Sequence, residues 1–491
     1  MNRSEGLHLL IVGWEASVVT DLWHPVASNG DIQYSFILHP RHTLDDFPKQ
    51  WHDDQMHFFR LRKSDPLLPQ DLSFLNWLEN DGVPTVHNMI LGDRVVSTLP
   101  YPDALSYATF LGKRLKELFE RIRPDAMIGS FDALHGSIAL AVAKRLNIPW
   151  FAMNFSVIPP GFACFCNQMS PAARVTMRAR SVEDGRLLAE SSLSDFELRR
   201  VSAPAYLEPP RLSIGGQIAR IPDRIAALVR TLRNGRDRHF HRYTESLGHY
   251  NVPGALKFLR KVASARSAVE RLEMMDLPPA QPYVFFGLHT QPESSIDVWA
   301  PYYSNQMWVI ETIARSIPPS HRLLVKIHKS DTGSYSASQL EKIRLLPGVD
   351  LVKPFADTRR FIERAALVFA IQGTIGLEAA LLGVPVVLLG DSPVALFPSA
   401  SRIGTIEDLP SVVQRKLAET KPHRTAILEA YATYLSPFEP AAHNDWTIKK
   451  SGAEFQKIAE MMDLLARYVA RGQVPLTDEE LPDHRPQAPL Q

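Results

Sequence analysis

The chain has 491 residues, which is too long for one hydrophobic core, so we expect two domains. Hydrophobic residues make up 45% of the chain and charged residues 22%, as in soluble globular proteins, and the formal net charge of +1 excludes a general attraction to nucleic acid or membrane. The only cysteines, Cys164 and Cys166, exclude a disulfide framework and are too few for a zinc site, so we expect a cytoplasmic protein without a metal.

The N-terminal region alternates short apolar runs with longer amphipathic segments. It predicts strands at 7–12 and 32–39, a helix that starts near 107, a strand that ends near 129, and a helix from 135 that leads into another strand. Such alternation is typical of parallel βαβ units in a doubly wound sheet. The first apolar run lacks the length and the cleavage site of a signal peptide, and no run approaches the roughly twenty apolar residues of a membrane span.

The middle of the chain, 181–278, has a different pattern, which is polar and helical. Between Arg199 and Glu273 there are 15 lysines and arginines against 6 aspartates and glutamates. This excess fits either a solvated helical insertion or a basic face for an anionic acceptor or the inner membrane surface. The second interpretation predicts peripheral membrane contact through residues 199–273.

The α/β pattern then resumes, with predicted strands at 283–289 and 322–329 and a helix at 306–317 between them. The helix-to-strand link "RLNIPWF" of the first half is similar to "LLGVPVV" of the second, which indicates two related halves. We therefore predict an N-terminal Rossmann-like domain at 1–180, a helical basic insertion at 181–278 and a C-terminal Rossmann-like domain at 279–440. A C-terminal helix at 441–473 is expected to pack back across the domains, and the Pro-rich tail at 474–491 is expected to be disordered.

Polar side chains follow the first predicted strand of the C-terminal half. The stretch "GLHTQPESSID" places His289, Gln291, Glu293 and Asp297 just after that strand. In open α/β sheets, ligands bind beyond the carboxyl ends of the strands. These side chains can therefore face a binding crevice, and the alternative is a polar surface turn.

The next predicted strand ends in "VKIHKSD", which contains Lys326 and His328. Period-two alternation would place both side chains on one face, and a lysine with a histidine suits a phosphate group. Alternatively, Lys326 extends its ammonium to solvent and His328 is an interior residue. Further along, Asp357 or Thr358 is expected to cap a helix.

The stretch "LVFAIQGTIGLEAALLGVPVVLLG" predicts a strand, a tight turn, a helix and a second strand. Gly373 permits backbone geometry that other residues resist, Thr374 can cap the helix, and free amides at a helix start form an anion site. We expect Glu378 in the first helical turn, where the helix dipole favours a carboxylate and where it can accept hydrogen bonds from ribose hydroxyls. An ordinary strand-to-helix turn is the alternative.

In the first half, "GSFDALHGSIAL" places Asp132 and His135 at a strand end just before a helix. Their i, i+3 spacing lets them share one surface if the helix has begun. Asp132 can then act as a general base and His135 as an acceptor ligand or proton carrier. Alternatively, Asp132 caps the helix and His135 lies in its first turn. Asp21 and His24 are weaker candidates for the same crevice.

Taken together, "LHTQPESSID", a following Gln306, "RLLVKIHKSD" and the stretch at 367–390 resemble the capsular polysaccharide biosynthesis glycosyltransferases, a group that includes bacterial Kdo transferases with a GT-B fold. The resemblance covers about residues 283–391. Members carry Gln-Pro-Glu, then Lys-x-His-Pro, then Gly-Thr and Glu before a Gly-x-Pro strand. In this chain Lys329 stands where Pro is usual, and the matching residues are Gln291, Pro292, Glu293, Lys326, His328, Thr374, Glu378 and Pro385.

The resemblance implies two Rossmann-like domains that face a cleft. The N-terminal one would bind a surface polysaccharide or other glycan, or a glycolipid, as acceptor, and the C-terminal one a nucleotide-sugar donor, for which a CMP-linked sugar is one candidate. It implies no metal, no cofactor and no nucleic acid partner. The implied donor-binding residues are Gln291, Lys326, His328, Gly373, Thr374 and Glu378, and the catalytic candidates are Asp132, Glu293 and His135. Three alternatives stay open: a polyol-phosphate transferase of teichoic-acid type, a sugar-nucleotide 2-epimerase, and a catalytically silent GT-B relative that binds glycan or scaffolds an assembly.

Overall fold

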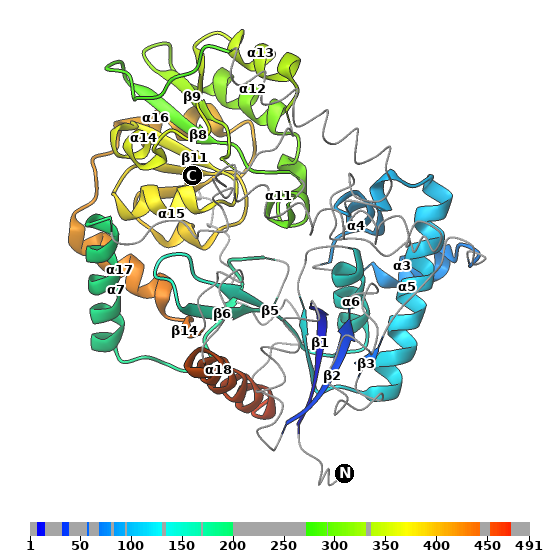
Figure 1. The fold of residues 1–491 in the computed structure, drawn as a ribbon. Coiled ribbons are helices and arrows are strands. Elements are labelled where there is room, and N and C mark those ends of the chain that lie inside the picture. The colour runs from blue at the N-terminus through cyan, green and yellow to red at the C-terminus, as the bar shows by residue number, and fades with distance from the viewer. Residues whose placement is uncertain are drawn as a thin grey trace, which may run out of the picture.

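The computed structural model describes residues 7–14, 32–38, 56–57, 68–79, 83–93, 96–129, 134–167, 170–199, 272–291, 293–329, 335–441 and 452–472. Within them the chain forms two sheet-containing halves, one coloured blue to cyan and the other green to orange in Figure 1. Predictions made for Asp21, His24, Asp132, Pro292, the basic segment 200–271 and the tail 474–491 lie outside the described residues.

The N-terminal sheet has a parallel core in which the first strand of the chain lies at the centre. The core order is β3-β2-β1-β4-β5, which is the three-strand order of a Rossmann mononucleotide-binding unit followed by two further parallel strands. These strands are β1 (Leu7–Trp14), β2 (Ile32–Leu38), β3 (Met56–His57), β4 (Ala126–Gly129) and β5 (Trp150–Phe155). Antiparallel pairing extends the sheet through β6 (Phe162–Cys166), which also pairs with β7 (Arg174–Val175) and β14 (Glu439–Pro440).

Helices cover both faces of this sheet because its strands are apolar on both sides. Leu10 and Val12 of β1 belong to the hydrophobic cluster under the helices α3 (Leu72–Leu78), α4 (Val86–Leu91), α5 (Tyr101–Ile122) and α6 (Leu134–Arg145). Leu9 and Ile11 belong to a second cluster, with α18 (Gly452–Ala470). The C-terminal helix therefore packs on the N-terminal sheet. Helix α5 begins six residues before the predicted start, with Pro102 in its first turn, where a missing amide proton costs nothing.

The C-terminal sheet is parallel throughout its six strands, in the order β10-β9-β8-β11-β12-β13. The strands are β8 (Tyr283–Gly287), β9 (Arg322–Lys326), β10 (Val349–Val352), β11 (Leu367–Ala370), β12 (Val386–Leu388) and β13 (Ala400–Arg402). In chain order this is 3-2-1-4-5-6, the dinucleotide-binding Rossmann order. Strand order reverses between β8 and β11, and ligands of such sheets bind outside this switch point.

Helices also cover both faces of the C-terminal sheet. One face packs against α12 (Gln306–Ser316), α13 (Ala337–Arg344) and α16 (Leu409–Ala418). The other packs against α14 (Thr358–Arg364), α15 (Thr374–Leu381), α17 (Arg424–Leu435) and α7 (Val182–Glu197). The predicted α/β class with two Rossmann-like sheets, as expected of a GT-B fold, is confirmed. The predicted strands at 283–289 and 322–329 end two and three residues early, so His289 and His328 lie in loops.

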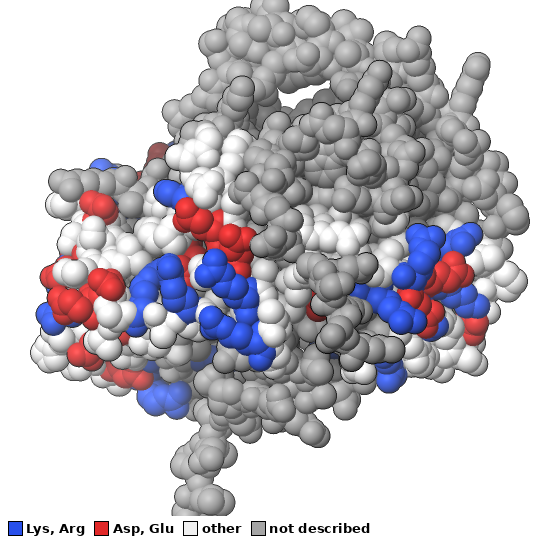
Figure 2. All heavy atoms as spheres, turned by 90° about the horizontal axis from the view of Figure 1, so that it is seen from below, with Lys and Arg blue, Asp and Glu red and all other residues white. Residues whose placement is uncertain are grey.

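The described surface carries charges of both signs. On the face shown in Figure 2, basic and acidic side chains lie beside one another in mixed groups. Among the helices that the structure describes, none combines the length and the apolar character that crossing a membrane requires. Membrane contact through 199–273 stays a prediction.

Two helical glycines should respond oppositely to alanine. A Cβ on Gly185 of α7 would have no atom of the described residues within 4 Å, whereas a Cβ on Gly376 of α15 would lie 3.1 Å from the Cβ of Ala370. Gly185→Ala is expected to raise the free energy of unfolding by about 0.5–1 kcal/mol, because alanine loses less backbone entropy. Gly376→Ala is expected to lower it by about 1 kcal/mol through overpacking. Urea denaturation measures both, and a destabilised Gly185→Ala variant would contradict this account.

Candidate functional site

The loops after β8, β9 and β11 meet at the switch point of the C-terminal sheet. The imidazole of His289, after β8, lies against Gly373, after β11, so a Cβ on Gly373 would be 3.1 Å from His289 Cε1 and 3.4 Å from Nε2. Burial, with a smaller contribution from the nearby His328, lowers the pKa of His289 to about 4. His289 is therefore a neutral imidazole at pH 7. Gly373 has φ −70° and ψ 166°, an extended conformation open to other residues, so the predicted special backbone geometry is wrong. The close His289 ring, and not the backbone, is what disfavours a side chain there.

His328, after β9, is joined to the loop after β8. Its Nδ1 atom lies 2.7 Å from the Thr290 Oγ1 atom, within hydrogen-bond distance. Strand β9 ends at Lys326, so the period-two rule does not extend from Lys326 to His328. The two predicted phosphate ligands accordingly have different partners, because the Lys326 ammonium donates to the Pro354 carbonyl at 2.6 Å.

Lys326 is buried, with 6% of its surface exposed. Burial lowers its pKa to about 8, Lys329 acts in the same direction, and Asp357 and Glu378 oppose the shift. Its hydrogen bond to the Pro354 carbonyl fixes the loop after β10. Lys326 also places a positive charge near Glu378. Asp357 caps α14 by accepting from the Arg359 amide at 3.1 Å, which confirms the capping prediction.

The amide side chain of Gln306 fixes the backbone of the β8 loop. Gln306 is 2% exposed, accepts from the His289 N–H at 2.8 Å, and donates to the His289 carbonyl at 3.1 Å and to Gln291 Oε1 at 3.0 Å. His289 therefore has little freedom to move. Gln306 was part of the sequence resemblance, but no function could be predicted for it, because a glutamine at the start of a helix has no distinctive pattern.

Asp297 holds the rest of this loop from the short helix α11 (Ser294–Asp297). Its carboxylate accepts from Gln291 Nε2 at 2.8 Å and from the Glu293 N–H at 2.9 Å. Both polar groups of the Gln291 amide thus bond within the protein. Gln291 therefore stabilises the loop after β8 through these bonds. Glu293 is the N-cap residue of α11.

The start of α15 differs in two details from its prediction. Gly373 is the N-cap and Thr374 the first helical residue, and no side chain caps the helix, so the predicted Thr374 cap is wrong. Glu378 is the fifth helical residue and the first turn holds no acidic residue, so its predicted first-turn position is also wrong. Because no side chain of the described residues bonds to the first amides of α15, these amides can bind an anion.

Glu378 is a partly buried carboxyl group one turn beyond these amides. Burial raises its pKa to about 7, Asp357 acts in the same direction, and Arg359, Lys329 and Lys326 oppose the shift. The Glu378 carboxyl group is therefore only partly ionised at pH 7, although basic side chains surround it. Lys329, in place of the usual proline, adds one of these positive charges.

A contact from the N-terminal half reaches the same turn. Gln372 Nε2 donates to the carbonyl of Asp391, and the Asp391 carboxylate contacts Ser170 Oγ of the β6–β7 loop. Arg402 Nη1 donates to the same carboxylate at 2.7 Å. Asp391 thus connects the Gln372-Gly373 turn to the N-terminal half.

In the N-terminal half, His135 lies in the first turn of α6, and burial lowers its pKa to about 4. His135 is therefore neutral at pH 7, and its predicted role as an acceptor ligand or proton carrier stays a prediction. The start of α6 is held by Asp93, whose buried carboxylate accepts from the Leu134 N–H at 2.9 Å. Sequence analysis missed Asp93 because its partner lies 41 residues away.

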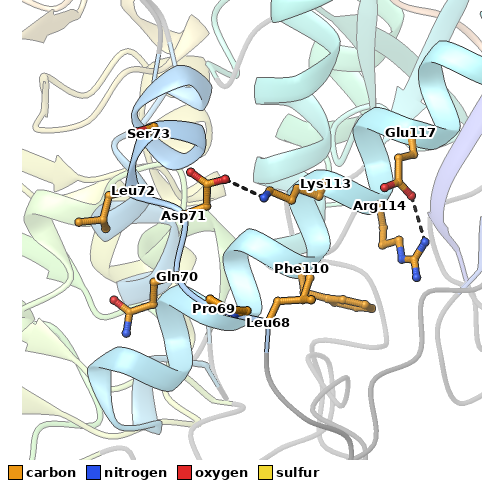
Figure 3. Close-up of a pocket in the computed structure, with 10 residues that line it drawn as sticks. All are labelled: Leu68, Pro69, Gln70, Asp71, Leu72, Ser73, Phe110, Lys113, Arg114 and Glu117. Atoms are coloured by element: carbon orange, nitrogen blue, oxygen red, sulfur yellow. Dashed lines mark hydrogen bonds and ion pairs between the residues drawn. The ribbon is translucent and has the colours of Figure 1, made fainter.

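A separate pocket of about 780 Å³ lies between α3 and α5 (Figure 3). Its charged side chains pair with one another, Lys113 with Asp71 at 2.6 Å and Arg114 with Glu117 at 3.0 Å. Its lining includes none of the predicted site residues that the structure describes. We therefore place the candidate site at the edge of the C-terminal sheet.

No family profile matches the chain, and no curated protein matches its sequence. Among solved structures it is similar to UDP-GlcNAc 2-epimerase from Methanocaldococcus jannaschii, at 12% identity over 93% of this chain and 99% of that chain, with a TM-score of 0.25. It is also similar to the KpsC beta Kdo 2,4 transferase from Thermosulfurimonas dismutans, at 12% identity over 69% of this chain and 87% of that chain, with a TM-score of 0.32. At these values the fold assignment rests on the strand orders of this chain.

Proposed function

We propose that the protein is a glycosyltransferase that moves a sugar from a nucleotide-activated donor to a glycan or glycolipid acceptor. One observation carries the proposal: at the switch point of a Rossmann-ordered sheet, His289 packs on Gly373 beside the uncapped start of α15, and Glu378 follows one turn later. In this proposal the helix amides and His328 bind the donor phosphate, and Glu378 accepts hydrogen bonds from the ribose.

The chemistry needs a carboxylate beside the reacting sugar. It either takes the proton from the acceptor hydroxyl or attacks the sugar to form a covalent intermediate. Glu293, held through its backbone by Asp297, and Asp132 of the N-terminal half are the two candidates. The amides of α15 with the basic groups around Glu378 offset the charge of the leaving phosphate, so we propose that transfer needs no metal ion or cofactor.

Isothermal calorimetry with CMP, CDP, UDP and GDP tests the donor site. At least one nucleotide is expected to bind in the range of about 1 μM to 1 mM that is usual for enzyme substrates. His328→Ala is expected to weaken binding about tenfold, because charge-assisted and histidine hydrogen bonds to phosphate are among the strong ones. His423→Ala, an exposed histidine before α17, is the matched control. If no nucleotide binds, the donor site is wrong.

Nucleotide affinity is also expected to depend on pH through Glu378. Its pKa is about 7, so the carboxylate that accepts from ribose is present above pH 7 and is lost below it. The dissociation constant should rise about tenfold from pH 8 to pH 6, because the ionised fraction of a carboxyl group with that pKa falls from about 0.9 to about 0.1 over this range. Protonation of a histidine near phosphate would act in the opposite direction. Glu378→Gln should remove the rise, and an identical pH profile in that variant would refute the role of Glu378.

A further inference from the structure

The turn that follows α4 contacts a segment of the C-terminal half. A Cβ on Gly92 would lie 2.8 Å from the backbone oxygen of Asp297, so Gly92 touches the end of α11 directly. Val298 and Trp299, which follow α11, pack against the hydrophobic cluster of the N-terminal sheet. Segment 293–299 therefore belongs to the C-terminal half by sequence and packs on the N-terminal half, as the neighbouring positions of α4 and α11 indicate (Figure 1).

Asp93, the residue after Gly92, holds the start of α6, which is the second segment with a catalytic candidate. The Asp93 carboxylate is 1% exposed and accepts from the N–H groups of Val96 at 2.8 Å and Leu134 at 2.9 Å. Leu134 is the first residue of α6, two residues after Asp132 and one before His135. Asp93 thus holds the first residue of α6, the helix that contains His135.

Asp297 connects the Gly92-Asp93 turn to the segment that contains Glu293. Its backbone oxygen touches Gly92, and its carboxylate binds Gln291 and the Glu293 N–H. We infer that the Gly92-Asp93 turn is a positioning element, which fixes the Glu293 segment and the start of α6 relative to each other. This inference rests on the proposed function for the role of the two segments. It makes the turn necessary for transfer and much less important for nucleotide binding. The proposed donor ligands His328, Gly373 and Glu378 follow β9 and β11, and segment 293–299 is linked to the Gly373 turn through the chain of contacts from Asp297 by way of Gln291 and Gln306.

Glycine is required at position 92 by lack of space. Its backbone has φ −74° and ψ −11°, a helical conformation that every residue other than proline adopts readily. Alanine therefore adds no backbone strain and introduces only the contact with the Asp297 oxygen. Since that neighbour is a backbone atom, it can yield only if α11 moves. Gly92→Ala is for this reason a selective test of the contact.

Hydrogen–deuterium exchange of the Gly92→Ala variant tests the contact without any substrate. In the native protein the amides of Asp297, Val298 and Trp299 donate to the carbonyls of Glu293 and Ser294. The variant is expected to exchange about tenfold faster over 293–299, with no change over α15. Val298→Ala, which loosens the same segment instead of pushing it, is expected to give the same pattern. Gly185→Ala, where an added Cβ meets nothing, is the matched control.

Kinetics then separate positioning from a general structural effect. In both variants kcat is expected to fall at least about tenfold, while the nucleotide dissociation constant stays within about twofold. Native exchange and native kcat in Gly92→Ala would overturn the inference, as would a parallel loss of nucleotide binding. If Gly92→Ala does not fold, Val298→Ala decides by the same criteria. If the wild-type protein binds no nucleotide, the proposed function fails, and the exchange experiment still decides whether the turn holds segment 293–299.

Discussion

Gly373→Val is expected to abolish nucleotide binding, with an affinity at least about 100-fold below that of the wild-type protein. Even the Cβ of alanine would lie 3.1 Å from His289 Cε1, and valine adds two more carbons at the same place. The ring has no easy retreat, because Gln306 holds the His289 backbone at both its N–H and its carbonyl. The turn and the start of α15 must therefore shift away from the phosphate position.

Calorimetry measures this loss, and circular dichroism verifies that the variant folds. Gly373→Ala should lie between wild type and Gly373→Val, while Gly185→Ala should bind as wild type. Removing the ring in the double variant His289→Ala/Gly373→Val should recover part of the affinity, if the clash is the cause. Wild-type affinity in Gly373→Val would show that the nucleotide does not bind at this turn.

Glu293→Gln is expected to lower the rate of sugar transfer by about 10²- to 10⁴-fold, the range for loss of a general base. The change keeps the shape of the side chain, and the Glu293 N–H still donates to Asp297, so the loop should stay in place. Nucleotide affinity should therefore be unchanged while kcat falls. A radiolabelled-sugar transfer assay with the donor found by calorimetry measures the rate.

The control is Glu183→Gln, an exposed glutamate in the first turn of α7, which should keep full activity. Full turnover by Glu293→Gln would remove Glu293 as the catalytic carboxylate. Asp132→Asn would then be the next test, and wild-type turnover in both variants would contradict a carboxylate mechanism based on these residues.

The sequence predicts the two sheets well because buried parallel strands are continuous apolar runs between helices. Strand ends are less well predicted, because residues that follow the last hydrogen-bonded pair of a strand are still buried. Leu288 and Ile327 are as buried as the strand residues before them, although β8 and β9 have already ended. The apolar pattern therefore extends past the hydrogen-bonded pairing, which moved His289 and His328 from predicted strands into loops.

The candidate site shows a similar division. Gly373 and His328 follow strands that the apolar pattern reveals, and Glu378 lies in the helix that begins after Gly373, so their neighbourhood could be predicted. The contacts that fix them join residues far apart in sequence: Gln306 bonds His289 17 residues away, and Asp93 bonds Leu134 41 residues away. Propensity and periodicity act over one or two turns, so they contain no information about such pairs.

The most direct test of the donor site is a crystal structure of the protein soaked with the nucleotide that binds in calorimetry. The account predicts phosphate oxygens at the first amides of α15, next to Thr374 and His328, and ribose hydroxyls within hydrogen-bond distance of the Glu378 carboxylate. A nucleotide bound at the N-terminal sheet, or in the pocket between α3 and α5, with nothing at the start of α15, would contradict it.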